Sequence, residues 1–126
     1  MIKILIADDS KFSQKVTANL IRKYIIDSDI YFADDGQEAY KKYIEINPDY
    51  IFADLLMPNV NGEELIKLIK KHNSNAKIIV ISADVQKDVR REIESYNVMS
   101  FINKPFNEEK ARLVYNMIRN DEKNER

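Results

Sequence analysis

Short apolar runs alternate with longer segments of helical period along the whole chain. Five such runs are rich in β-branched residues, and in the segments between them apolar residues recur every three or four positions. Short buried strands that alternate with amphipathic helices are typical of βα units around a parallel sheet. Because the strands are apolar throughout rather than alternating, both faces of the sheet should be buried, and we expect helices on each side of it.

The alternation predicts five strands and five helices. We expect strands at residues 3–7, 30–33, 50–53, 77–81 and 100–102. We expect helices at residues 11–24, 37–46, 85–96 and 108–118, and one more that carries Leu65, Ile66 and Ile69. The first helix presents Phe12, Val16 and Leu20 at i, i+4 spacing. The helix at 85–96 has only a thin apolar stripe, so it should be weakly held.

Glycine occurs only twice, so each position is informative. Gly36 follows Asp34 and Asp35 at the start of a helix, and Gly62 precedes another helix. Either glycine can take a positive φ, which would strain other residues. We expect the Asp-Asp-Gly segment to act only as a turn and helix cap. Asn97 is the residue that we expect to close a helix in the left-handed conformation, which asparagine tolerates better than most residues.

Length and composition limit the class of protein. The 126 residues suit one domain, which we expect at residues 1–120. A polar tail should follow at residues 121–126, and we expect the chain to fray from residue 120. A net charge of −1 argues against nucleic acid as a direct partner, since binding its phosphate backbone requires a basic excess. No apolar run approaches the roughly 20 residues needed to span a bilayer, and no cleavable signal pattern opens the chain. We therefore expect a cytoplasmic protein without a membrane partner.

Polar side chains follow four of the apolar runs at their carboxyl ends. They are, in chain order, Asp8 and Asp9, Asp54, Ser82, and Lys104. Because the carboxyl ends of parallel strands meet at one edge of the sheet, where ligands bind in open α/β folds, these groups should converge. An acid pair, a further acid, a hydroxyl and an amine at one edge would build a metal-assisted phosphate site.

The three acids predict a divalent cation. Neighbouring carboxylates repel one another by on the order of 4 kcal/mol per pair at ~4 Å and an effective dielectric near 20. With no cysteine in the chain and no histidine nearby, the ligands suit Mg²⁺, with Mn²⁺ as the alternative. If Asp54 attacks a phosphoryl donor, the metal and Lys104 neutralise charge while Ser82 donates a hydrogen bond. The acyl phosphate so formed is hydrolysable and suits a temporary signal.

Each of these residues also has an ordinary structural explanation. The acid pair alone could form a turn, Ser82 could cap a helix, and Lys104 could be a solvated charge. Phe101, in the last apolar run, could be a plain core residue. Only the joint occurrence of the polar groups favours a phosphate site. His72, the sole histidine, is expected at the surface, as neither a ligand nor a phosphohistidine.

In order and spacing, these residues resemble the receiver domain of two-component response regulators, over residues 2 to about 118. The likeness is carried by Asp8 and Asp9, by Asp54, Met57, Pro58 and Gly62, by Ser82 and Ala83, and by Lys104, Pro105 and Phe106. It implies an α/β fold of flavodoxin-like type, a five-stranded, parallel, doubly wound (βα)5 sheet of order 2-1-3-4-5. It also implies a signalling protein that catalyses only its own phosphorylation and dephosphorylation.

The resemblance assigns roles to individual residues. Asp54 is implied as the phosphoacceptor, and the metal ligands are Asp8, Asp9, Asp54 and the backbone carbonyl of Leu56. Phosphate binding and switching are implied for Ser82, Ala83, Lys104 and Phe101. Modulating positions are Leu56, Asp84 and Pro105, and the Lys104–Pro105 bond is commonly cis in this family. The chain departs from the family at Phe101, which lacks the hydroxyl of a frequent tyrosine, and at Tyr96 and Asn97, where alanine and glycine are usual.

We therefore expect a stand-alone, chemotaxis-regulator-like receiver that accepts a phosphoryl group from a histidine kinase or a phosphotransfer protein. Phosphorylation would alter binding of a downstream protein through the face formed by the last strand and the helices on either side of it. A monomer, or a weak dimer on phosphorylation, is expected. Motility control and a phosphorelay step both stay open, and the chain could be part of a longer polypeptide.

Two alternatives belong to other classes. Aspartyl-phosphate phosphatases of the haloacid dehalogenase type also use an aspartate nucleophile and Mg²⁺. In those enzymes the nucleophile and the second acid lie two residues apart after the first strand, whereas here the acids are adjacent and the candidate nucleophile, Asp54, follows the third strand. A pseudo-receiver would bind partners without phosphorylation, but the complete set of polar groups argues against it.

Overall fold

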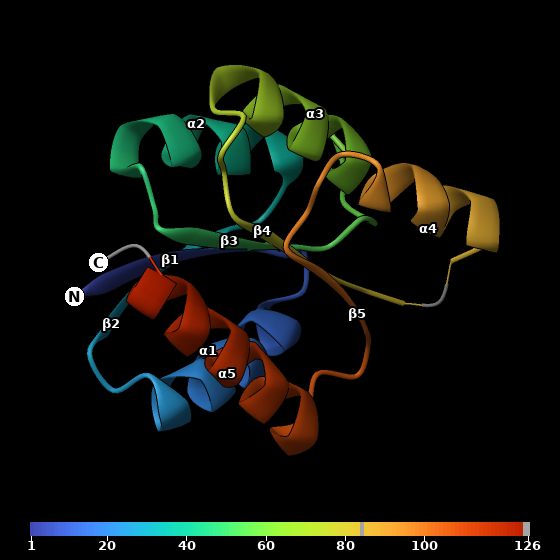
Figure 1. Cartoon of the computed structure of the whole chain (residues 1–126). Helices are drawn as coiled ribbons and strands as arrows, with labels where there is room; N and C mark the ends of the chain where they lie inside the picture. The colour runs from blue at the N-terminus through green and yellow to red at the C-terminus, as the bar shows by residue number, and fades with distance from the viewer. Residues whose placement is uncertain (84, 125–126) are drawn as a thin grey trace.

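Five parallel strands form a single sheet in the order β2-β1-β3-β4-β5. The computed structural model describes residues 1–83 and 85–124. The strands are β1 (Ile2–Ala7), β2 (Ser28–Ala33), β3 (Tyr50–Ala53), β4 (Ile78–Ser82) and β5 (Ser100–Asn103). The helices are α1 (Lys11–Tyr24), α2 (Gly36–Ile46), α3 (Gly62–His72), α4 (Lys87–Glu94) and α5 (Glu108–Asn124). Figure 1 shows α2, α3 and α4 on one face of the sheet and α1 and α5 on the other, which confirms the doubly wound fold.

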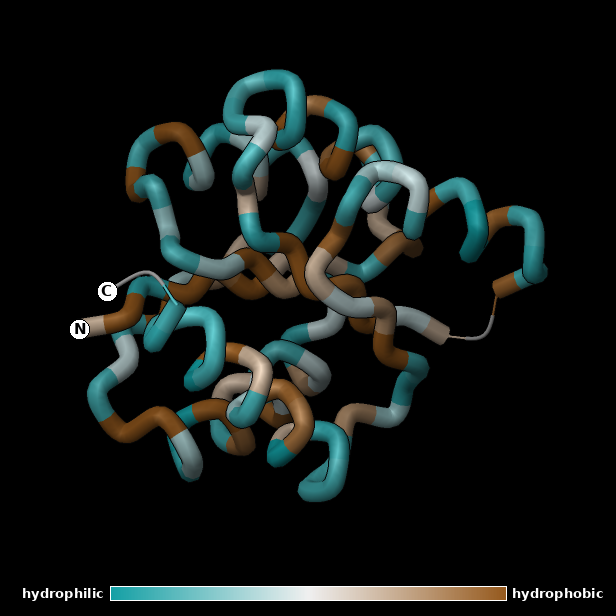
Figure 2. The backbone as a smooth tube through the Cα atoms, in the orientation of Figure 1, coloured by the Kyte–Doolittle hydropathy of each residue, from teal (hydrophilic) through white to brown (hydrophobic). Residues whose placement is uncertain are grey.

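Each face of the sheet has its own core. Along β1, Leu5 and Ala7 belong to the cluster under α2, α3 and α4, while Ile4 and Ile6 belong to the cluster under α1 and α5. Figure 2 shows the strands as a mostly hydrophobic layer between helices of mixed character. Alternate residues of one strand thus stabilise both helix layers, as expected from the continuous apolar runs.

Helix α1 buries a different face from the one that the apolar spacing indicated. Its buried residues are Gln14, Thr17, Ala18 and Ile21, whereas the Phe12 ring is 77 % exposed. The buried face thus combines two polar side chains and an alanine with Ile21, while the large Phe12 lies outside the core. The expected helix at 85–96 is shorter, and α4 buries only Ile93 fully, which confirms its thin packing.

The two glycines are explained by close approach of the backbone, because neither takes a positive φ. A Cβ atom on Gly36 would lie 1.8 Å from the Val60 carbonyl oxygen, and one on Gly62 would lie 2.3 Å from the Asp54 carbonyl oxygen. The left-handed conformation is instead adopted by three asparagines, Asn47, Asn59 and Asn97. The prediction for Asn97, with a φ of 64°, is therefore confirmed.

The prediction that the chain frays from residue 120 is wrong for residues 120–124, because they form the last part of α5. The hydroxyl of the buried Tyr50 lies 2.6 Å from Asp121 Oδ2 and 2.9 Å from Glu122 Oε2. The Lys77 ammonium also pairs with Asp121. These polar side chains therefore hold the last turns of the helix against the sheet. None of the described helices is long and apolar enough to cross a membrane.

Asp121→Asn tests this attachment. Burial raises the pKa of Asp121, but hydrogen bonds from Lys77 and Tyr50 lower it by more, so the net pKa is below its ordinary value. The charged form thus stabilises the fold above the pKa of an unfolded aspartate, and this contribution is lost as the pH falls through the folded pKa. We expect the variant to lower the free energy of unfolding near neutrality by about 1 to 2 kcal/mol.

Urea unfolding at several pH values measures this difference, which should shrink as the pH drops below about 4. The control is Asp27→Asn. The Asp27 side chain is 77 % exposed, and its ion pair with the amino terminus of the chain is long, at 3.7 Å, so it should be weak. The control should change stability by less than about 0.5 kcal/mol. A deficit in Asp121→Asn that is equal at all pH values would contradict the ion-pair explanation.

Candidate functional site

The register of the sheet brings the acidic residues together. Ala7, the last residue of β1, pairs with Ala53, the last residue of β3, so Asp8 and Asp54 leave neighbouring strands at the same level. The amide of Asp54 donates to the Ala7 carbonyl at 3.0 Å, which extends the ladder by one residue. The expected convergence of strand ends is therefore present.

A second pair of strand ends brings the hydroxyl and the amine to the same place. Ser82 pairs with Asn103 across β4 and β5, and the amide of Lys104 donates to the Ser82 carbonyl at 2.7 Å. The Lys104–Pro105 peptide bond is cis, as expected. The side chains of Ser82 and Lys104 then both reach Asp54 from the neighbouring strand ends.

Asp54 is a nearly buried carboxylate with three donors on it. Its side chain accepts the Ser82 hydroxyl at 3.0 Å and the Leu56 amide at 3.1 Å on one oxygen. The other oxygen accepts the Lys104 ammonium at 2.8 Å. Only 6 % of Asp54 is exposed, and Ser82 is fully buried. Donors of both kinds, neutral and charged, thus fix the orientation of this carboxylate.

Lys104 joins Asp54 to Asp8, whose carboxylate lies 3.0 Å from the ammonium. Burial raises the pKa of Asp8 above its ordinary value, although hydrogen bonds from Ser10 and Lys104 oppose it. Burial alone would lower the pKa of Lys104, but its hydrogen bonds to the two acids raise it by more, so the ammonium stays charged. A permanent cation therefore sits between the two buried acids.

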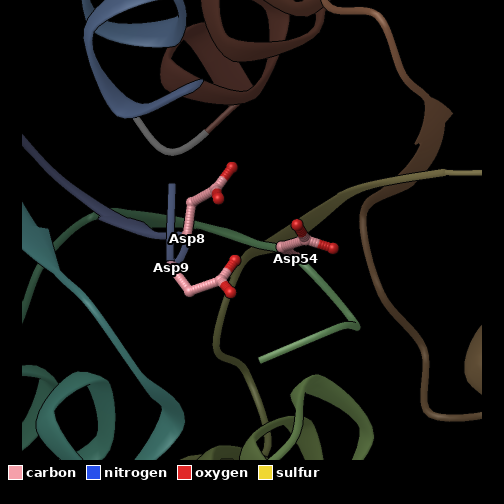
Figure 3. A group of neighbouring side chains, drawn as sticks. All are labelled: Asp8, Asp9 and Asp54. Carbon is pink, nitrogen blue, oxygen red and sulfur yellow. The ribbon is translucent and has the colours of Figure 1, made fainter. Parts of the chain in front are cut away.

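Asp9 completes the acidic cluster from the solvent side. One carboxylate oxygen from each of Asp8, Asp9 and Asp54 lies within 4.8 Å of the others, and Figure 3 shows the three side chains grouped at the ends of β1 and β3. When ionised, three carboxylates and one ammonium leave two negative charges, which a divalent cation would neutralise. The oxygen-only donor set fits a hard cation of the Mg²⁺ type.

Gln14 supports the cluster and was not identified from the sequence. Its buried amide donates to the Asp8 carbonyl at 2.6 Å and to the Asp34 carboxylate at 2.8 Å. It therefore links the acid-bearing segment after β1 to the turn after β2. The only sequence signal was its place near the start of α1, because its partners lie in two other segments.

Phe101 lies on β5, three residues before Lys104, and is almost buried, with 9 % of its surface exposed. The guanidinium of Arg90, on α4, lies 4.7 Å from the centre of the Phe101 ring. A cation over an aromatic face is attractive, by about 0.5 to 2 kcal/mol. This contact adds to the packing of Ile93 and Val89 against the core in holding α4 to the sheet.

The remaining described residues to which the resemblance assigned a role are exposed at the surface. The Leu56 side chain is 64 % exposed, and those of Ala83 and Pro105 are also exposed. Asp84 lies outside the described residues. His72 is exposed, as predicted. The roles assigned to the site residues stay predictions.

Comparisons with known proteins agree with this geometry. The family described as the response regulator receiver domain matches residues 4–116. Chemotaxis protein CheY of Thermotoga maritima is 39 % identical over 106 residues, which cover 82 % of this chain and 86 % of that protein. The protein-glutamate methylesterase/protein-glutamine glutaminase of the same organism is 36 % identical over 83 % of this chain, but the match covers 31 % of that protein. A chain in the crystal structure of the CheX-CheY-BeF3-Mg complex from Borrelia burgdorferi matches with a TM-score of 0.81 and 28 % identity, over 93 % of this chain and 86 % of that one.

Asp9→Ala tests the electrostatics of the cluster. The exposed Asp9 contributes like-charge repulsion, so its removal should leave the fold equally stable or more stable. The same change removes one candidate ligand, so Mg²⁺ binding should weaken several-fold. Calorimetric titration with magnesium chloride and urea unfolding measure the two effects. Glu45→Ala, which removes an exposed carboxylate in the last turn of α2, should change neither. Unchanged Mg²⁺ affinity together with lower stability would show that Asp9 is structural.

Proposed function

Because this chain belongs to the response regulator receiver family, we propose that it accepts a phosphoryl group on Asp54 from a histidine kinase or a phosphotransfer protein. The main evidence is the surroundings of Asp54. Its carboxylate is nearly buried at a strand end, with the Lys104 ammonium at 2.8 Å and the Ser82 hydroxyl at 3.0 Å. Receivers of this kind are signalling proteins rather than enzymes that act on a separate substrate. The phosphoryl group is then a temporary mark on this chain.

In the proposed reaction, a carboxylate oxygen of Asp54 forms a bond to phosphorus while the bond from phosphorus to the donor breaks. The donor keeps the electron pair of the broken bond, and Asp54 becomes an acyl phosphate. The Lys104 ammonium and the Ser82 hydroxyl, which bind the free carboxylate, are then available to bind phosphoryl oxygens. Such charge-assisted hydrogen bonds are the stronger ones, at roughly 1.5 to 3 kcal/mol each.

The acidic cluster would hold Mg²⁺, or Mn²⁺, through Asp8, Asp9, Asp54 and the Leu56 backbone carbonyl. When bound, such an ion offsets negative charge on the phosphoryl oxygens and on the acids around them. Without a bound metal, the Lys104 ammonium holds the Asp8 and Asp54 carboxylates close together by pairing with both. The chain's own contribution is thus an arrangement of acids that needs little rearrangement before reaction.

We further propose that the face formed by α4, β5 and α5 changes on phosphorylation and alters binding of a downstream protein. Ser82 and Phe101 lie on neighbouring strands, since Val80, two residues before Ser82, pairs with Phe101. A shift of the Ser82 hydroxyl toward a phosphoryl oxygen would free space near the Phe101 ring. Arg90 would follow that ring, because it stacks on it from the thinly packed α4.

The phosphatase alternative has less support. The nucleophile of such a phosphatase would follow the first strand. Here the carboxylate that accepts hydrogen bonds from both Lys104 and Ser82 is Asp54, which follows β3. The products of a phosphatase would also differ, because it turns over many molecules of an external phosphate ester. Turnover of a generic phosphate ester therefore separates the two classes.

Phosphorylation itself gives a direct prediction. Incubation with acetyl phosphate and Mg²⁺ should add the mass of a single phosphoryl group to the intact chain, and chelation of the metal should prevent it. Asp54→Asn should abolish the added mass, while Asp88→Asn, at an exposed position on α4, should leave it unchanged. Retention of the added mass in Asp54→Asn would refute the assignment, and catalytic turnover of a phosphate ester would favour the phosphatase.

The switch gives a second prediction. Ser82→Ala should still be phosphorylated on Asp54, but it lacks the hydroxyl that couples the site to β5. A hydrogen bond to a charged group biases a two-state equilibrium by about tenfold to a hundredfold. NMR amide shifts over Val85–Phe106 on addition of beryllofluoride and Mg²⁺ should therefore be much smaller than in the parent. Ser74→Ala, at an exposed position, is the control and should respond like the parent. A parent-like response in Ser82→Ala would disprove the coupling.

A further inference from the structure

The segment Asp34–Gly36, called here the turn at residues 34–36, joins β2 to the first residue of α2 and contacts both segments that carry the acidic cluster. The sequence favoured a turn and helix cap alone, and Asp35 does cap α2 by accepting the Glu38 amide at 2.8 Å. The turn does more than this, because each of its three residues also contacts another loop or helix near the cluster.

The first connection runs to Asp8. The carboxylate of Asp34 accepts the Gln14 side-chain amide at 2.8 Å, and the same amide donates to the Asp8 carbonyl at 2.6 Å. Gln14 is buried, whereas the Asp34 carboxylate is 46 % exposed and also pairs with Lys11 at 2.9 Å. The turn thereby fixes the backbone at the first acid.

The second connection runs to the loop between β3 and α3, residues 54–61, called here the β3–α3 loop. The second carboxylate oxygen of Asp35 accepts the Asn59 side-chain amide at 3.0 Å, so one aspartate caps its helix and holds the loop. Asn59 has a φ of 65°, in the left-handed region that asparagine tolerates. The loop tip is thus held in an unusual conformation by a specific donor and acceptor.

The third connection is steric. Gly36 has no positive φ, yet a Cβ on it would lie 1.8 Å from the Val60 carbonyl oxygen and 2.6 Å from its carbon. The backbone of the β3–α3 loop therefore rests directly on the first residue of α2. Glycine at this position provides space for the loop rather than conformational freedom.

The β3–α3 loop is the segment that carries Leu56 next to Asp54. The Leu56 amide donates to the Asp54 carboxylate at 3.1 Å, and the Gly62 amide closes the loop on the Leu55 carbonyl at 3.0 Å. Both ends of the loop are thus tied to the strand end that bears Asp54. Its tip is tied to the turn at residues 34–36, so displacement of the tip would be transmitted to Leu56.

We infer, on the premise of the proposed function, that Asp35 and Asn59, with Gly36 beneath the loop, are positioning residues for the divalent-metal site. They are not among the candidate carboxylate ligands of the metal, which are Asp8, Asp9 and Asp54. They hold the β3–α3 loop so that the Leu56 backbone keeps its place beside Asp54. Because Gln14 ties the same turn to Asp8, one three-residue segment contacts both acid-bearing segments, whose relative position the sheet register already sets.

The test is Mg²⁺ binding by isothermal titration calorimetry, with Asn59→Gly as the main variant. Glycine accepts the left-handed φ without strain, so the change removes the amide while the loop conformation stays accessible. We expect Mg²⁺ to bind about tenfold more weakly, the effect typical of residues that orient metal ligands. Asn47→Gly is the matched control, since Asn47 is also left-handed, with a φ of 51°, at the far end of α2. The control should bind Mg²⁺ like the parent.

A second variant, Asp35→Ser, keeps a helix-capping oxygen but loses the second oxygen that Asn59 uses. It should weaken Mg²⁺ binding to a similar degree, and the double variant Asp35→Ser with Asn59→Gly should be no weaker than either single variant. The urea midpoints of the metal-free proteins show whether global stability explains the effect, and every variant should remain folded under the conditions of the titration.

Parent-like Mg²⁺ affinity in both single variants would overturn the inference, as would an equal loss of affinity in Asn47→Gly. Additive losses in the double variant would also overturn it, because the two residues would then act independently. Failure of the proposed function looks different, since the parent itself would then bind no Mg²⁺ and accept no phosphoryl group.

Discussion

The ammonium of Lys104 holds the site together by pairing with both Asp8 and Asp54. Two ionised carboxylates this close repel each other, and each attracts the shared cation by on the order of 5 kcal/mol at about 3 Å and an effective dielectric near 20, before desolvation is counted. The pairing requires that the carboxyl ends of β1, β3 and β5 meet at one edge of the sheet, which their parallel arrangement provides. The exposed Asp9 and the buried Ser82 hydroxyl both lie next to this pair of acids.

Around this fixed centre, the two sides of the molecule differ in how firmly they are held. On the side of α2, the turn at residues 34–36 is tied to the acid-bearing segments by hydrogen bonds and by close backbone contact. On the side of α4, a short helix with one fully buried residue packs through Ile93 and Val89, and its Arg90 lies over the Phe101 ring. The function we propose, binding a metal and transmitting the state of the site, would use both properties. The rigid side suits binding, and the loosely packed side suits a change in partner contacts.

The sequence predicted the features that depend on local pattern. Apolar runs gave the strands, and the polar residues that follow them lie together because neighbouring parallel strands end at one edge. Asn97 was identified because few residues tolerate a positive φ. Features that depend on distant partners were missed. Asp121 pairs with Tyr50, 71 residues away, so nothing in the polar end of the chain indicated an ordered helix. Gly36 was noted for its freedom, although its contact with Val60 explains it better.

The chemical identity of the phosphorylated residue is the most direct test of the proposed function. Borohydride reduces an acyl phosphate to the corresponding alcohol, so a phosphorylated aspartate becomes homoserine. After incubation with acetyl phosphate and Mg²⁺, reduction and peptide mass mapping should place homoserine at position 54 and at no other acid. Homoserine at position 8 or 9, or its absence from a chain that carries the phosphoryl mass, would contradict the assignment of Asp54.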